Sequence, residues 1–405
     1  MGNLQCKYIC KPKEIEEKMD IINYNYENDI INEKSTHYNY NYFLHDSSYS
    51  NKVTIDGKYL LFKKSFEEKL PLIGKYISLN EFESLIPEDA RRFMTENILD
   101  ISKHLSPEIK TYEIKPVEFI GGNVYKGNWN EKAEMQGYGQ YYLKEEKVLA
   151  EGVWNEGCLI FARVFLPNGD LYEGEFKNSV FNGKGKLIMN NGEIYEGNFI
   201  NGEKIGKCNY LFPDGAIYNG NILNGFFNGK GNMKWNNGIK YSGNFLKSTL
   251  NGFGIMTSLE GDKYEGFFNK NYMNGSGKYY YDNGDIYKGN FEEGKRNGKG
   301  IYIRNDGFIY DGEWEDDLMN GNGKVKIENH PFKCIFRNGK INKIIIHQQK
   351  SKEPQDNYLY FYNMISEFKP EESNFCKYIL SHLEYNNNIF SQYGPEIMPS
   401  FFKDG

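Results

Sequence analysis

The sequence predicts a mainly β protein, an elongated single-file array of antiparallel β-hairpins with short helical segments at both ends. Three observations support this fold class. Glycine recurs at 23-residue intervals, aromatic side chains follow these glycines at strand spacing, and Asn-Gly or Asp-Gly pairs lie where tight turns are needed. Periods of roughly 20 to 50 residues are typical of repeat architectures, whose units stack in a row.

The first strand of each repeat begins after a turn glycine, because glycine adopts the positive φ of a tight turn. Tyrosine follows this glycine after three residues, a second glycine after five, and Phe, Ile or Trp after seven. Alternate residues of a strand point to one face, so these three positions share a face. The turn glycines are Gly169, Gly192, Gly215, Gly238, Gly261, Gly284 and Gly307, and the tyrosines are Tyr172, Tyr195, Tyr218, Tyr241, Tyr264, Tyr287 and Tyr310.

The second strand of each repeat carries a Gly-x-Gly motif, with one departure where Cys208 follows Gly206. A single hairpin is only marginally stable in water, so the repeats must stack. With strands about 4.8 Å apart, about nine repeats give a rod roughly 85 Å long. The motifs lie at Gly183/Gly185, Gly229/Gly231, Gly252/Gly254, Gly275/Gly277, Gly298/Gly300 and Gly321/Gly323.

This pattern, Tyr-x-Gly-x-Phe/Trp followed by Gly-x-Gly, resembles the MORN repeat. Two earlier units are less regular, the first with Tyr125 and Trp129 and the second with Ala150 in place of tyrosine. We expect four regions. They are an acylated, largely disordered N-terminal segment (1–51), a helical N-terminal cap region (52–116), the repeat array of about nine repeats with a degenerate cap (117–346), and a C-terminal helical cap or docking segment (347–405).

Helical signals lie on both sides of the array. Ser78 and Glu81 match a capping box, and a second helix is expected after Pro87, with an apolar stripe that ends at Leu105. This stripe favours packing onto the first repeat over partner binding, because the end of a repeat array needs covering. Residues 14–32 alternate acids, Asn and Ile, which predicts a weak helix.

The N-terminus resembles an N-myristoylation signal, with Gly2 after Met and Cys6 where the strict motif has Ser or Thr. One myristoyl chain binds membranes weakly, with a partition constant of about 10⁴ M⁻¹, so stable anchoring needs a second signal. Palmitoylation of Cys6 and Cys10 would supply it, and each nearby lysine adds about 1 kcal/mol at an anionic surface. The alternative is an ordinary N-terminus with two incidental cysteines. The nearby lysines are Lys7, Lys11 and Lys13.

The residue between the paired glycines is lysine in four repeats, so stacking predicts a partial basic stripe of Lys184, Lys207, Lys230 and Lys299. The family resemblance implies contact with acidic lipids. The favoured alternative is a solvated edge, where lysine discourages strand-to-strand aggregation.

Catalytic and metal-binding motifs are missing from the sequence. It contains no phosphate-binding G-x-x-x-x-G-K-[ST] loop, no G-x-G-x-x-G, no HExxH and no EF-hand loop. A rod of hairpins also lacks the enclosed pocket that catalysis needs. The net charge of −6 gives no reason to expect nucleic-acid binding. We therefore expect no enzyme activity, no catalytic residue, no cofactor and no metal.

These features predict a scaffold or tether on the cytoplasmic face of the plasma membrane or of an internal cortical membrane system. The acyl chains and N-terminal lysines would bind the membrane, and the resemblance implies protein partners in the cortical cytoskeleton or in signalling complexes. A homo-oligomer is compatible with this interpretation. Two alternatives stay open, a regulatory subunit that positions a phosphatase or lipid kinase, and an acidic-phospholipid-binding module that acts without acylation.

Overall fold

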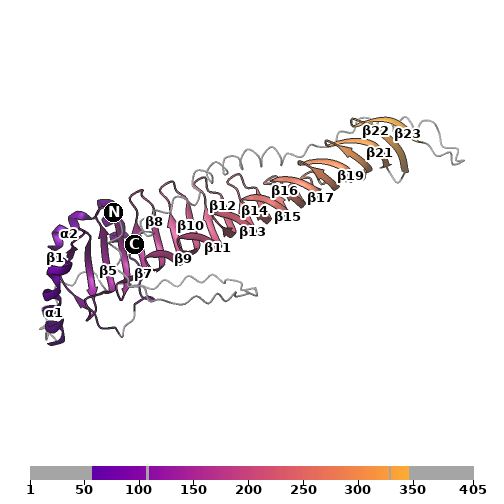
Figure 1. Cartoon of the computed structure of the whole chain (residues 1–405). Coiled ribbons are helices and arrows are strands. Elements are labelled where there is room, and N and C mark those ends of the chain that lie inside the picture. Colours follow the sequence, from indigo (N-terminus) through magenta and orange to yellow (C-terminus); the bar gives the residue numbers. More distant parts are fainter. Residues whose placement is uncertain (1–56, 106–108, 328–329, 346–405) are drawn as a thin grey trace, which may run out of the picture.

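The computed structural model describes residues 57–105, 109–327 and 330–345. They form one open antiparallel sheet of 23 strands, with three helices at its N-terminal end (Figure 1). The predicted fold class, a mainly β elongated array of hairpins, is confirmed. Gly2, Cys6 and Cys10 lie outside the described residues, as do the expected helices at 14–32 and after residue 346, and the division into four regions stays a prediction.

Consecutive strands pair as hairpins from one end of the array to the other. A last hairpin of β22 (His330–Arg337) and β23 (Lys340–Ile345) follows the regular ones. The regular hairpins are β4 (Val124–Trp129) with β5 (Met135–Leu143), β6 (Val148–Asn155) with β7 (Cys158–Phe165), β8 (Leu171–Lys177) with β9 (Val180–Ile188), β10 (Ile194–Ile200) with β11 (Glu203–Leu211), β12 (Ile217–Leu223) with β13 (Phe226–Lys234), β14 (Lys240–Leu246) with β15 (Thr249–Thr257), β16 (Lys263–Asn269) with β17 (Tyr272–Tyr280), β18 (Ile286–Glu292) with β19 (Lys295–Ile303), and β20 (Ile309–Glu315) with β21 (Leu318–Ile327).

Two kinds of turn alternate along the array. Between hairpins, a turn glycine such as Gly215 has φ +88° and donates its N–H to the carbonyl of Phe212. Within hairpins, two-residue turns place both residues at positive φ, as in Asn224 (+51°) and Gly225 (+77°). That geometry matches the right-handed twist of the flanking strands and gives a tight hairpin.

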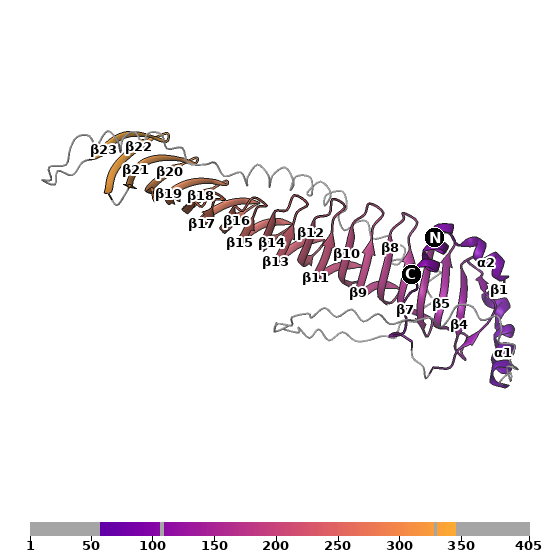
Figure 2. The same ribbon diagram turned by 180° about the vertical axis from the view of Figure 1, so that it is seen from behind.

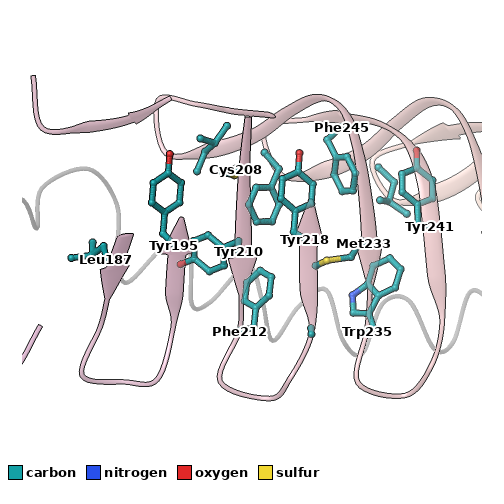
Figure 3. Close-up of a cluster of buried hydrophobic side chains, with 14 of the residues drawn as sticks. Leu187, Tyr195, Cys208, Tyr210, Phe212, Tyr218, Met233, Trp235, Tyr241 and Phe245 are labelled. Carbon is teal, nitrogen blue, oxygen red and sulfur yellow. The ribbon is translucent and has the colours of Figure 1, made fainter. Parts of the chain in front are cut away.

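The inner face of the sheet holds the core of the array. Tyr218 is fully buried there and donates its hydroxyl to the carbonyl of Asn221 at 2.8 Å. Its ring meets Phe245 of the next repeat edge-on, with centroids 5.1 Å apart. The tyrosine recurs in the neighbouring repeats, so Tyr195, Tyr218 and Tyr241 lie in a row with their hydroxyl groups pointing the same way (Figure 3). Offset and edge-on aromatic pairs of this kind add to the stability gained by burial.

The helices gather at the N-terminal end of the sheet (Figure 2), where they bury residues of both its faces. Helix α1 (Gly57–Ile73) packs on the inner face, where Phe66 meets Trp129 at 4.8 Å between ring centroids. Helices α2 (Leu79–Leu85) and α3 (Glu88–Glu96) pack on the outer face. Phe82 and Ala90 of these helices, with Ile86 between them, form a buried cluster with Val124, Tyr142 and Leu149.

Short strands complete this end. β1 (Gly74–Tyr76) pairs with β3 (Val117–Phe119), and β2 (Tyr112–Glu113) pairs with β4. The capping box is confirmed, since Ser78 and Glu81 exchange both hydrogen bonds. The predicted second helix packs on the first repeats, but its extension to Leu105 is wrong. Asn97 leaves helical geometry and bonds its side chain to the carbonyl of Phe93, which ends the helix.

Candidate interaction surfaces

The tyrosines of the inner face are used in packing. Burial raises the pKa of Tyr218 and of its counterparts Tyr195 and Tyr241 far above the ordinary value, so they stay neutral. Each hydroxyl donates to a backbone carbonyl of its own strand. The chemistry of this face is therefore structural.

The outer face presents the predicted lysines in one row. Lys184, Lys207 and Lys230 are exposed on β9, β11 and β13. The register places an asparagine opposite each, so lysine and asparagine alternate across six strands. The pairs are Lys184 with Asn198, Lys207 with Asn221, and Lys230 with Asn244.

The fourth predicted lysine lies apart from the other three. Lys299 is on β19, opposite Glu313. Between Lys230 and Lys299 the row carries exposed Phe253 and Phe267, whose rings meet edge-on with centroids 5.8 Å apart. The sheet thus brings three of the four lysines together. Whether any of them contacts lipid stays a prediction.

A shallow hollow of about 290 Å³ lies in the same outer face, over β12 to β15. Sequence reasoning missed it, because it depends on which residues of four strands become neighbours. Its lining combines aliphatic, amide, hydroxyl and lysine side chains. The outward-pointing residues are Ile217, Asn219, Asn232, Lys234, Lys240, Ser242, Ile255 and Thr257.

Two cations lie at inner-face positions and were also missed. Arg296 is 1% exposed, pairs with Asp317 at 2.8 Å and lies over the Trp314 ring at 4.8 Å. Lys204 lies between the rings of Tyr195 and Tyr210, and burial lowers the pKa of its ammonium. The 23-residue register could have found both, because the corresponding residues elsewhere are Phe181, Phe227, Leu250, Met273 and Met319.

The inner face also holds two free cysteines, Cys208 and Cys334. Burial raises the pKa of the Cys208 thiol to about 12 and that of Cys334 to about 11. Since the thiolate is the reactive form, these thiols are inert near neutral pH. Both occupy the inner face where other repeats have glycine or a small residue, which is a packing role.

Within the described ranges, no group of three His, Cys, Asp or Glu side chains is placed to hold a metal ion. In this same part of the chain, no helix is both long and apolar enough to cross a membrane. The features that remain for interaction are the lysine–asparagine row and the hollow, both on the outer face.

Comparison with known proteins identifies the repeat. The MORN repeat family model matches six segments, while no curated protein matches the chain. Hairpins β4–β7 and β14–β15 lie outside the matched segments but have the same strand pairing. The matched segments are residues 172–194, 195–217, 218–240, 264–286, 287–308 and 310–329.

Solved structures similar to this chain include domains of CPAP and SAS-4. The TCP10 domain of Danio rerio CPAP is 14% identical, with a TM-score of 0.28, and the match covers 46% of this chain and 86% of that domain. The TCP domain of Drosophila melanogaster SAS-4, solved with a proline-rich motif of Ana2, is 16% identical with a TM-score of 0.25. That match covers 38% of this chain and 84% of the domain. At these TM-scores the likeness carries no argument about this chain.

Proposed function

We propose, from the premise that this chain is a MORN-repeat protein, that it is a scaffold held on a cytoplasmic membrane face by its acylated N-terminus. The repeats indicate a role in protein binding or membrane association, and an array of this kind fits a non-enzymatic protein. The membrane would be the plasma membrane or an internal cortical membrane, and the partners would belong to the cortical cytoskeleton or to signalling complexes.

The observation that carries the scaffold proposal is the difference between the two sheet faces. The inner face is filled by its own aromatic rows, whereas the outer face of β12 to β15 exposes polar, basic and apolar side chains. Equivalent outer positions recur every two strands, which is about 9.6 Å at a strand spacing of about 4.8 Å. A rigid row of this kind suits partners that must be held at fixed distances.

The anchor proposal rests on the N-terminal residues. Gly2, Cys6 and Cys10 offer sites for one myristoyl and two palmitoyl chains, with Lys7 and Lys11 nearby. This segment precedes α1 in the sequence, and residues 11–56 link it to the array. Two acyl signals together give stable binding, whereas one alone gives reversible binding.

A second candidate function is an acidic-phospholipid-binding module. The observation that favours it is the row of Lys184, Lys207 and Lys230, with asparagine rather than acid opposite each lysine. A third candidate, a regulatory subunit that positions a phosphatase or lipid kinase, has no comparable surface to support it among the described residues.

Fractionation of two variants tests the anchor. Gly2→Ala removes the myristoyl site, and palmitoylation follows membrane contact, so this variant should be soluble at every salt concentration. Cys6→Ser with Cys10→Ser leaves one acyl chain and the lysines, so it should bind membranes at low salt only, because salt screens the lysine contribution. Wild-type membrane binding by both variants would overturn the proposal.

A further inference from the structure

The outer face of β13 and β14 concentrates positive charge without any acid to balance it. Lys234 lies directly opposite Lys240 across the strand pair, and Lys230 lies on the same face. All three are exposed, and none forms an ion pair within the described residues. Like charges directly opposite each other destabilise a sheet, so this arrangement calls for an explanation. We call these three lysines and the hollow beside them the lysine trough.

Acidic residues are almost missing from this part of the sequence. Strands β12 to β15 contain no Asp or Glu. From residue 204 to 259 the single acid is Asp214, in a turn, where it accepts a hydrogen bond from the N–H of Ala216. The nearest outer-face acid on the next strand, Glu265, is paired with Lys263 at 2.5 Å. In a chain of net charge −6, the trough is a local excess of positive charge.

The hollow beside the lysines fits a segment that carries aliphatic side chains. Ile217 and Ile255 give it apolar walls, and Asn219, Asn232 and Ser242 supply hydrogen-bonding groups. Lys234 and Lys240 lie at the same hollow. A fitting occupant therefore carries both carboxylates and aliphatic side chains.

We propose that residues 14–33 of this same chain cover the lysine trough. That segment holds seven acids against one lysine, and five isoleucines are interspersed with the acids. Its chemistry is the complement of the trough in both charge and apolar character. The acids are Glu14, Glu16, Glu17, Asp20, Glu27, Asp29 and Glu33, and the isoleucines are Ile15, Ile21, Ile22, Ile30 and Ile31.

The chain is long enough for this contact. The described residues begin at Gly57, so 23 residues separate Glu33 from the start of α1, a span of up to about 80 Å when extended. The trough lies nine strands beyond β4, about 43 Å at a strand spacing of about 4.8 Å. A tethered segment also acts at an effective concentration on the order of millimolar, which favours this occupant over a free one.

In this contact the carboxylates of residues 14–33 neutralise Lys230, Lys234 and Lys240, which have no acid beside them within the described residues. This inference goes beyond the proposed function and does not depend on acylation, so it is tested on the unacylated full-length chain, where failure of the anchor proposal has no effect.

Zero-length carbodiimide cross-linking with peptide mass spectrometry tests the contact directly, because it joins a lysine only to a carboxylate that touches it. We expect amide links between the trough lysines and residues 14–33, in a yield that does not change with protein dilution. Raising NaCl from low salt to about 1 M shortens the Debye length from about 30 Å to about 3 Å. The yield should then fall at least fivefold.

Matched variants separate this contact from general charge effects. Glu14→Gln, Glu16→Gln, Glu17→Gln and Asp20→Asn together should reduce cross-links to the trough at least fivefold. Lys230→Ser, Lys234→Ser and Lys240→Ser should abolish salt-sensitive protection of residues 14–33 from hydrogen exchange. The control changes Lys288, Lys324 and Lys326 to Ser, which are exposed on the outer face of β18 and β21, and should leave that protection as in wild type.

Three results would overturn the proposal. The first is the absence of links between residues 14–33 and the trough. The second is a yield that rises with protein concentration, which assigns the trough to a second copy of the chain. The third is binding of the wild-type chain to phosphatidylserine vesicles through the trough lysines, with no change when the acids are neutralised, which assigns the trough to a lipid surface.

Discussion

The first two hairpins and the middle hairpins are built from the same repeat. The first two bury both faces of the sheet, whereas the middle hairpins bury only the inner face. In β4 to β7 both faces are covered, and outer positions such as Val124, Tyr142 and Leu149 are buried under α2 and α3. In β12 to β15 only the inner face is buried, and outer positions such as Asn219 and Ser242 are exposed. Residue type at the outer rows therefore decides whether a repeat is covered by its own chain or left open.

The border between the two regions is marked by one arginine. Arg163 on β7 is buried, donates to the carbonyl of Asn97 at 2.6 Å and pairs with Glu173 at 3.0 Å. It also lies over the Phe93 ring of α3 and within 3.8 Å of Glu151. This side chain ties the end of the helical cap to the sheet, and beyond it the outer face is open.

The largest expected effect comes from filling the inner face. A Cβ at Gly243 would lie 2.3 Å from the Tyr241 hydroxyl and 2.6 Å from the Cα of Gly254, so Gly243→Val should cost about 3 kcal/mol or more. Urea unfolding measures the loss. The control is Ser242→Val, one residue away on the exposed face, which should change stability by less than about 0.5 kcal/mol. Equal effects at both positions would remove the distinction between the faces.

Removal of the border arginine should release the cap. Arg163→Ala leaves the largely buried carboxylate of Glu151 without its cation, which costs about 3 kcal/mol. Hydrogen exchange should then speed up in residues 79–97 while the strands after β16 keep wild-type protection. Arg304→Ala, which removes a half-exposed pair with Asp306, serves as control and should cost less than about 1 kcal/mol. Unchanged protection of the cap in the Arg163 variant would contradict its role.

A smaller effect, of opposite sign, is expected from the inner-face lysine. Burial lowers the pKa of Lys204, so the folded state disfavours its charge, and Lys204→Met should stabilise the array by about 0.5 kcal/mol. The penalty is complete below the lowered pKa and disappears as pH rises toward the ordinary value. The melting-temperature gain of the variant should therefore shrink as pH rises toward the ordinary pKa of lysine. A gain that grows with pH would show the sign to be wrong.

Much of the fold followed from the sequence, because its signals are local and periodic. The tyrosine and glycine rows predicted the strands and the buried face, and Ser78 with Glu81 predicted the start of α2. Features without such a signal could not be predicted from the sequence. The in-hairpin turn at Lys247 and Ser248 has no glycine to mark it, although both residues have positive φ. The end of α3 depended on how the Asn97 side chain bonds.

One candidate surface could also be predicted from the sequence, and the other could not. The row of Lys184, Lys207 and Lys230 could be predicted, because each lysine occupies the same place in its repeat. The hollow could not, since it requires the register that sets Lys234 opposite Lys240 and places Ile217 and Ile255 along the same hollow. Gly2, Cys6 and Cys10 form a motif that can be recognised in the sequence but lies outside the described residues.

Flotation with acidic vesicles tests most directly the claim that the N-terminus, and not the open face of the repeats, holds this protein on a membrane. Myristoylated, palmitoylated chain should float with vesicles that contain phosphatidylserine, and unacylated chain should remain in the soluble fraction at physiological salt. Flotation of the unacylated chain, lost when Lys184, Lys207, Lys230 and Lys299 are changed to Ser, would contradict the account and assign membrane binding to the repeats.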